Sequence, residues 1–214
     1  MLNLAEELFL LALDDEDGSI AAPALDTLRY GLAAALLADL TLLGKIAVED
    51  QRISLLDPAP TSDDLLDDTL HRIAQSNKPR KVKYWISALG FRKLPKQIAE
   101  RLVARGVLCE EERRYLWVTP YAIYPQQDAS AKYWIKQGLR AAGLTSAKPE
   151  QRGVVLLSLM KGCRLLTLVF TKDERKAAGK RVDELVKGED FGAAVAQTLA
   201  DIEAAATAVA ATAG

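Results

Sequence analysis

The chain has 214 residues, half of them apolar, and a formal net charge of -1. This length and composition suit one large domain or two small ones with a substantial core, and they exclude the disordered and fibrous classes of protein. Cys109 and Cys163 lie far apart without CxxC spacing, so the sequence predicts neither a disulfide framework nor a zinc knuckle and favours a reducing cytoplasm.

Helices are predicted at the start of the chain. Asn3 and Glu6 have capping-box spacing at the head of an apolar helix that ends in the acidic turn 14–18. A leucine stripe over residues 25–43, surrounded by Gly and Ala, predicts the central helix of the fold, with Gly44 in the left-handed position after it.

A hairpin and three short helices are predicted next. Residues 46–55 alternate in polarity on either side of a polar turn, which predicts a hairpin with one face on the core. Asp63 is placed to cap the following helix, and a basic loop, 77–80, leads to two helices that end at Gly106.

A second hairpin is predicted after the helix that ends at Gly106. Residues 107–109 and 115–118 flank a polar turn and predict a second hairpin, and an aromatic loop, 121–124, follows it. Further helices are predicted near 129–142, 150–169, 173–187 and 191–212. No linker rich in Gly, Ser and Pro interrupts the chain, so we expect a single, mainly α domain over 1–214 with one or two small β-hairpins.

Charge is segregated along the sequence. Residues 1–70 contain fifteen Asp/Glu and three Lys/Arg, about -12, whereas residues 71–140 contain fifteen Lys/Arg and five Asp/Glu, about +10. A basic block attracts phosphate on a lipid, a nucleic acid or a small ligand even when the whole protein is near neutral. The alternative is that the two blocks pack against each other and neutralise.

Catalytic chemistry has little support in the sequence. His71 is the one histidine, and its place on an amphipathic helix favours a surface residue. The acidic turn 14–17 lacks the alternating ligand pattern of an EF-hand, and neither a phosphate-binding GxxxxGK[ST] loop nor a GxGxxG motif is present. We therefore expect no enzyme, no metal and no cofactor.

Two groups of residues are the candidate functional sites. Arg92, Lys93 and Lys96 lie at a helix entrance, where free backbone N–H groups add to phosphate affinity, so they are the predicted anionic lipid-binding residues. Tyr115, Leu116 and Trp117 have the amphipathic pattern of a membrane interface, and they are predicted to contact a membrane or a second copy of the chain. No run reaches the roughly 18 to 20 apolar residues that span a bilayer, so membrane contact would be peripheral.

Several segments, in order and over nearly the whole chain, together resemble the Golgi phosphoprotein 3 family. They are Leu4–Leu13 with Asp14–Gly18, the Gly31–Leu32 helix ending in Leu43–Ile46, Pro60–Asp67, Trp85–Ile86 and Arg101–Leu108. The resemblance implies a central helical bundle wrapped by amphipathic helices, with a protruding hairpin at 107–118 used in self-association and membrane contact.

The same resemblance implies a ligand and partners. Eukaryotic members of the family bind phosphatidylinositol 4-phosphate and recruit the tails of membrane-bound glycosyltransferases. Of the four lipid-pocket positions, three carry Ala24, Ala33 and Pro95 here and one keeps Arg92, with Lys93 and Lys96 as adjacent donors. The short chain and its Ala-rich C-terminal segment are similar to bacterial members.

The leading hypothesis is a non-enzymatic, cytoplasmic or peripheral membrane adaptor that binds anionic, phosphoinositide-like headgroups. It requires the bases between Lys78 and Arg105 to converge into a single solvent-facing anion site. The rival is a nucleic-acid-binding helical module of winged-helix-like layout, although the acidic segments in 1–70 argue against a long nucleic-acid footprint. A third hypothesis is a scaffold whose partner is another protein.

Overall fold

Helices dominate the architecture of the protein. A computed structural model describes residues 1–115, 119–146, 149–162 and 164–187, together with 204, 208 and 211. Its elements are α1 (Leu4–Ala12), η1 (Ala22–Ala24), α2 (Leu28–Leu42), β1 (Ile46–Glu49), β2 (Arg52–Leu55), α3 (Asp64–Ala74), β3 (Arg80–Lys81), α4 (Val82–Leu89), α5 (Leu94–Ala104), β4 (Glu111–Tyr115), β5 (Thr119–Ile123), α6 (Ser130–Leu144), α7 (Gln151–Gly162), η2 (Leu166–Leu168) and α8 (Glu174–Lys187). The mainly α fold with small hairpins is therefore confirmed.

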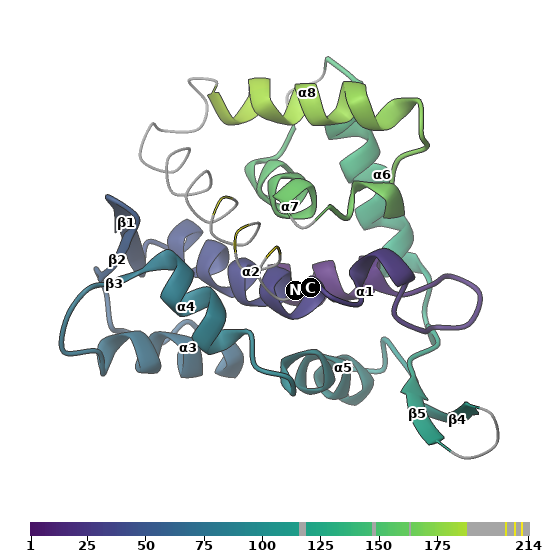
Figure 1. Cartoon of the computed structure of the whole chain (residues 1–214), viewed down its shortest axis with the longest axis horizontal. Helices are drawn as coiled ribbons and strands as arrows, with labels where there is room; N and C mark the ends of the chain where they lie inside the picture. The colour runs from purple at the N-terminus through teal and green to yellow at the C-terminus, as the bar shows by residue number, and fades with distance from the viewer. Residues whose placement is uncertain are drawn as a thin grey trace.

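Helices α1 and α2 form the centre of the fold. They pack against each other along their length, and nearly all of their side chains are buried. A helix that is apolar on every side needs neighbours on every side. In Figure 1 α3, α4 and α5 cover one side of this pair and α6, α7 and α8 the other.

The surrounding helices are amphipathic. Helix α3 buries Leu66, Leu70 and Ile73 on one face, and α5 buries Ile98 and Leu102 in the same way. Their remaining faces are polar and exposed, as the 3.6-residue period predicts. The central bundle wrapped by amphipathic helices is thus confirmed.

Two predicted helix boundaries are wrong. The leucine stripe predicted a helix from residue 25, but α2 begins at Leu28, and Leu25 and Leu43 beyond its ends are 64% and 52% exposed. The helix predicted over 150–169 ends at Gly162. In both segments apolar residues continue past the point at which the helix stops, so periodicity does not mark the boundary. The helix predicted at 191–212 lies outside the described residues, apart from 204, 208 and 211, which are helical.

The first hairpin is confirmed, and it gains a strand. Strand β1 pairs with β2, with Val48 opposite Ile53. The predicted basic loop ends in β3, where Arg80 pairs with Ile53 of β2 in antiparallel register. A two-residue strand has no alternation to detect, so only the fold reveals it. The pairing of β3 with β2 therefore fixes the backbone position of Arg80.

The second hairpin exists, but its predicted register is wrong. Residues 110–114, predicted as the turn, belong mostly to β4, and the predicted aromatic loop 121–124 is mostly β5. In Figure 1 this hairpin projects away from the helices. Residues 111–114 are all exposed, because a ribbon that projects into solvent has no core face to impose alternation. The turn, 116–118, lies outside the described residues.

Within the described ranges, no helix has both the length and the apolarity that crossing a bilayer requires.

Candidate anion-binding site

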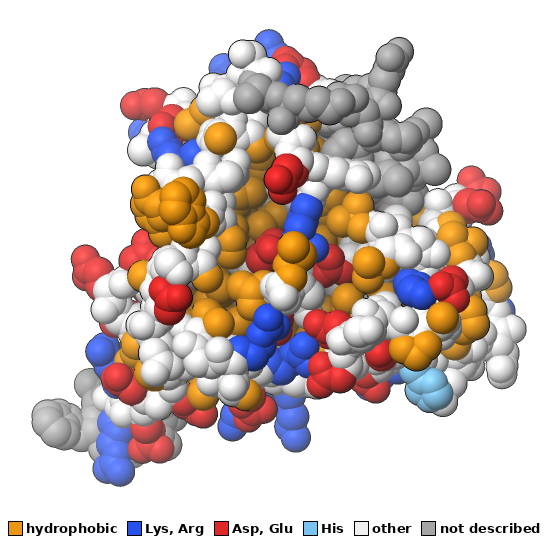
Figure 2. Space-filling view, turned by 180° about the vertical axis from the view of Figure 1, so that it is seen from behind, with side chains coloured by type: hydrophobic (Ala, Val, Ile, Leu, Met, Phe, Trp, Pro, Cys, Tyr) orange, Lys and Arg blue, Asp and Glu red, His pale blue; other side chains and the backbone are white. Residues whose placement is uncertain are grey.

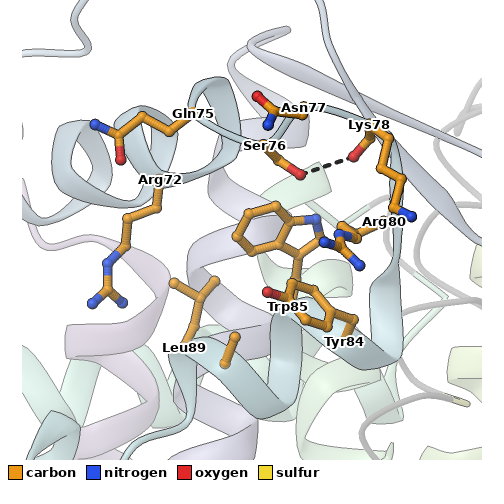
Figure 3. A pocket seen from close by; sticks show the side chains of 10 residues that line it. Arg72, Gln75, Ser76, Asn77, Lys78, Arg80, Tyr84, Trp85 and Leu89 are labelled. Atoms are coloured by element: carbon orange, nitrogen blue, oxygen red, sulfur yellow. Dashed lines mark hydrogen bonds between the residues drawn. The ribbon is translucent and has the colours of Figure 1, made fainter.

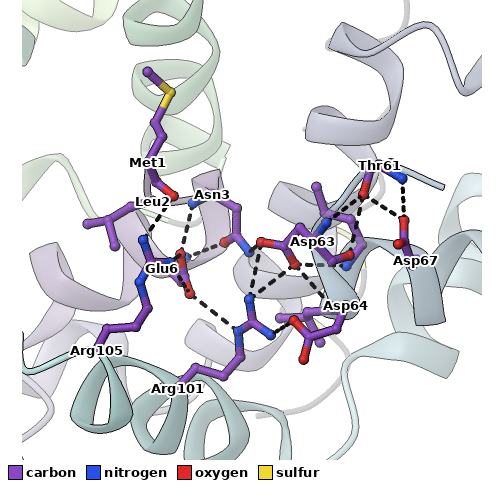
Figure 4. Close-up of polar contacts among 12 residues, drawn as sticks. Met1, Leu2, Asn3, Glu6, Thr61, Asp63, Asp64, Asp67, Arg101 and Arg105 are labelled. Carbon is purple, nitrogen blue, oxygen red and sulfur yellow. Dashed lines mark hydrogen bonds and ion pairs between the residues drawn. The ribbon is translucent and has the colours of Figure 1, made fainter.

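The bases between Lys78 and Arg105 do not converge into one site, so the expectation of a single anion site built from them is wrong. Arg101 of α5 and Arg105, which follows its last residue, turn inward to the acidic first part of the chain, as Figure 4 shows. Glu6 of α1 is fully buried and accepts hydrogen bonds from Nε of Arg101 at 3.3 Å and from an Nη atom of Arg105 at 2.9 Å. These two arginines are therefore neutralised by the protein itself.

The same network joins α5 to the start of α3. An Nη atom of Arg101 lies 3.1 Å from both carboxylate oxygens of Asp63, and Arg101 also pairs with Asp64. Partial burial opposes the charge of Arg101, but the hydrogen bond to Asp64 and the nearby carboxylates outweigh it, so the pKa of Arg101 is raised. Asp63 at the same time caps α3 through the N–H groups of Leu65 and Leu66, as predicted.

The acidic turn before η1 neutralises further bases. Lys132 of α6 is buried and lies 2.5 Å from Asp15, which also pairs with Lys136. Burial lowers the pKa of Lys132, and the two lysine hydrogen bonds lower the pKa of Asp15 in spite of its partial desolvation. The acidic turn 14–17 thus binds α6.

Charges of both signs are also mixed on the surface that Figure 2 draws. Figure 2 shows acidic and basic side chains side by side there instead of one continuous basic field. The alternative in which the acidic and basic blocks neutralise is therefore confirmed for Arg101, Arg105, Lys132 and Lys136.

Arg92 belongs to the predicted site, and its positive charge remains available to a ligand. It is exposed, and it has no carboxylate partner among the described residues. It lies in the turn between α4 and α5, which Gly90 holds close to the start of α2. A Cβ atom at Gly90 would lie 2.8 Å from the ring of Tyr30 and 3.3 Å from the carbonyl oxygen of Arg29. Only glycine lets the two segments approach this closely.

This approach creates a pocket that we call the Arg29–Arg92 pocket. Its volume is about 370 Å³. It is lined by Ile20, Leu25, Asp26, Leu28, Arg29, Arg92 and Pro95. Two guanidinium groups at one surface hollow form a donor set suited to an anion, and one acidic residue, Asp26, opposes it.

Sequence reasoning missed Arg29. The guanidinium group of Arg29 lies 4.5 Å from the ring centre of Tyr30 and donates to its hydroxyl at 2.6 Å, which fixes its position. Ala33, the position that the family resemblance assigns to an arginine, is fully buried. Arg29 precedes it by four residues and so lies on the same helix face one turn earlier, a spacing that a search of neighbouring turns would have found.

The other predicted lipid-binding residues lie beside this pocket and do not line it. Lys93 is the N-terminal cap position of α5 and is exposed. Lys96 is also exposed, and its ammonium group lies 3.7 Å from Glu100 one turn later. The structure therefore brings Arg92 together with Arg29 and Pro95, while the two lysines are on the adjoining surface.

The predicted hairpin site is only partly described. Tyr115 is the last residue of β4, opposite Thr119 of β5. The side chain of Tyr115 and the whole of Leu116 and Trp117 lie outside the described part of the structure. On the neighbouring strand, Tyr121 is 42% exposed.

The fold and the site define a class of protein: a helical domain with a basic surface pocket whose rim includes an exposed leucine. The family follows from comparison with known proteins. The family model described as Golgi phosphoprotein 3 (GPP34) matches residues 4–202, and the chain therefore belongs to that family.

Proposed function

We propose that this chain is a non-enzymatic peripheral membrane adaptor that binds an anionic, phosphoinositide-like headgroup in the Arg29–Arg92 pocket. This proposal does not require the bases between Lys78 and Arg105 to converge, because the pocket takes only Arg92 from that stretch and Arg29 from α2. Membership of the Golgi phosphoprotein 3 (GPP34) family is consistent with an adaptor. The observation that carries the proposal is that Arg29 and Arg92 line the same surface pocket. Leu25, which is 64% exposed, lines it as well. A charged pocket with an apolar rim suits a headgroup at the water–lipid boundary.

The first turn of α5 adds to this attraction. Arg92 and Pro95 both line the pocket, so the N-terminal end of α5 faces it. This end of a helix carries a partial positive charge and is a common site for phosphate. Lys93 and Lys96 would add to the potential from the adjoining surface.

The four bases give only modest affinity. Each base close to an anionic surface contributes about 1 kcal/mol, so Arg29, Arg92, Lys93 and Lys96 together contribute about 4 kcal/mol. This corresponds to a Kd of about 1 mM, so a second attachment is needed. In this proposal the projecting β4–β5 hairpin supplies the second attachment, either by entering the membrane or by binding a second copy of the chain. The tails of membrane proteins are the proposed cargo.

Vesicle co-sedimentation at low salt tests the proposal. Phosphatidylcholine vesicles with an added phosphoinositide should bind the protein, and pure phosphatidylcholine should not. The Arg29→Gln/Arg92→Gln variant removes two charges at the pocket and should bind about 30-fold more weakly, the equivalent of about 2 kcal/mol.

The matched control is Lys172→Gln/Lys176→Gln, which removes two exposed charges near the start of α8. Equal binding to both vesicle types, or an equal loss in the two variants, would refute a pocket-specific headgroup site. Duplex DNA tests the rival hypothesis: steep salt-dependent binding that ignores vesicles would favour a nucleic-acid module. The inward pairing of Arg101 and Arg105 argues against that outcome, because these two bases are then not available to contact the phosphates of a nucleic acid.

A further inference from the structure

A second basic pocket lies between the end of α3, the segment leading to β3, and α4. We call it the Trp85 pocket, and its volume is about 680 Å³. It is lined by Arg72, Gln75, Ser76, Asn77, Lys78, Arg80, Tyr84, Trp85, Ala88 and Leu89. This set contains three bases and no carboxylate, and it shares no residue with the Arg29–Arg92 pocket.

The positive charges of the three bases in this pocket remain available to a ligand. In contrast to Arg101, none of Arg72, Lys78 and Arg80 has a carboxylate partner within the described ranges. Aromatic faces support the two arginines: the guanidinium carbon of Arg80 lies 4.9 Å from the ring centre of Tyr84, and that of Arg72 lies 5.7 Å from that of Phe91. A guanidinium group stacked on a ring still presents its N–H edge to a ligand.

The backbone around the pocket is fixed before any ligand arrives. The pairing of β3 with β2 holds Arg80 on the sheet, and the hydroxyl group of Ser76 donates to the carbonyl oxygen of Lys78 at 2.8 Å. Arg52 also donates to the carbonyl oxygen of Pro79 at 3.0 Å. A preorganised site loses less conformational freedom when it binds.

Two buried donors in this pocket have no hydrogen-bond partner in the part of the chain that the structure describes. They are Nε1 of Trp85, whose side chain is 5% exposed, and Nε of Arg80. In Figure 3 the indole of Trp85 lies between Arg72 on one side and Arg80 on the other, with its nitrogen on the side of Arg80 and Lys78. Buried donors are almost always paired in folded proteins, so this pair points to an acceptor supplied from outside the chain.

The donor set identifies the ligand chemistry. A phosphate monoester carries nearly two negative charges and three acceptor oxygens, which suits two guanidinium groups, an ammonium group and an indole N–H. The pocket is much larger than a phosphate ion, and Gln75 and Asn77 add amide groups that both donate to and accept from hydroxyl groups. We propose that the Trp85 pocket binds a phosphate monoester on a hydroxylated carrier. This proposal does not depend on the function proposed for the Arg29–Arg92 pocket.

The indole signals in a ¹H–¹⁵N spectrum give a direct test on the full chain. The sequence contains three tryptophans, and Trp85→Phe identifies the signal of Trp85. Glucose 6-phosphate should shift that signal saturably, whereas glucose should leave it in place. Lys78→Gln and Arg72→Gln should each weaken binding about tenfold, because each removes one charge-assisted contact. Thermal unfolding of each variant shows that it is folded.

Lys172→Gln/Lys176→Gln is the control variant and should leave the affinity for glucose 6-phosphate unchanged. No shift of the Trp85 signal at millimolar ester, an equal shift with glucose, or unchanged affinity in both pocket variants would overturn the proposal.

The source of the ester is resolved with vesicles of phosphatidylcholine and phosphatidic acid. If Lys78→Gln weakens sedimentation with them, and glucose 6-phosphate competes, the ester is a lipid headgroup; if only glucose 6-phosphate binds in the pocket, the ligand is soluble. Vesicle binding that is lost in Arg29→Gln/Arg92→Gln, with an unmoved Trp85 signal, would leave the membrane proposal standing and refute this one.

Discussion

The buried carboxylate of Glu6 allows a quantitative test of the ionic network that holds the fold. Glu6→Gln keeps the shape of the side chain and removes its charge. The carboxylate accepts from the backbone N–H of Asn3 at 2.9 Å, from Arg101 at 3.3 Å and from Arg105 at 2.9 Å. The glutamine keeps one acceptor oxygen and turns an NH₂ group toward an arginine.

The expected cost follows from the solvent exposure of the two arginines. Removing one partner of a buried ion pair costs about 3 to 5 kcal/mol. The side chain of Arg105 is 37% exposed and stays hydrated after the change, and Arg101 keeps Asp63, so neither charge is left both buried and unpaired. We therefore expect a loss of about 3 kcal/mol, at the lower end of that range.

Urea unfolding followed by circular dichroism measures the loss. With a slope of about 2 kcal/mol/M, the midpoint should fall by about 1.5 M. Glu16→Gln makes the same chemical change at an exposed position of the acidic turn and should alter stability by less than about 0.5 kcal/mol. A loss below about 1 kcal/mol for Glu6→Gln would show that the network contributes little and would refute this reasoning.

The other predictions concern pH and packing. The hydrogen bond from Arg140 lowers the pKa of Glu174 from 4.5 to about 2, so this pair stabilises the fold above pH 4.5 and the contribution is lost as the pH falls through about 2. The stability difference between the wild type and Glu174→Gln, measured by urea titration at several pH values, should therefore be constant above pH 4.5 and close to zero at pH 2; a difference that grows on acidification would contradict it. Leu36→Ala in the middle of α2, where the side chain is 1% exposed, should cost about 3 kcal/mol by the same measurement, and a cost under about 1 kcal/mol would mean that the core collapses around the cavity.

Elements with a buried face could be predicted from the sequence. The capping box of Asn3 and Glu6, the cap at Asp63 and the left-handed Gly44 all form as their local patterns indicate. Each depends on neighbours within a few residues, or on a periodic apolar face, and both signals are present in the sequence. The β4–β5 hairpin has neither, and its predicted register is wrong.

The candidate sites were less predictable, because they depend on contacts between distant segments. Nothing local indicates that Arg101 is neutralised by Glu6, which lies 95 residues earlier, whereas Arg92 in the same basic block stays exposed. The sequence indicates that a base is present, and only the fold determines which carboxylate it meets. That Arg29 and Arg92 line the same pocket follows only from the close packing of the two segments at Gly90.

The burial of α1 also has a consequence for synthesis of the chain on the ribosome. Glu7 of α1 pairs with Arg152, which is made 145 residues later, and at about 5 to 20 residues per second this interval lasts roughly 7 to 30 s. During that time the first helix, which is almost wholly buried in the folded protein, has no finished core to enter. The apolar residues of this helix therefore lack their final neighbours until the second half of the chain has been made.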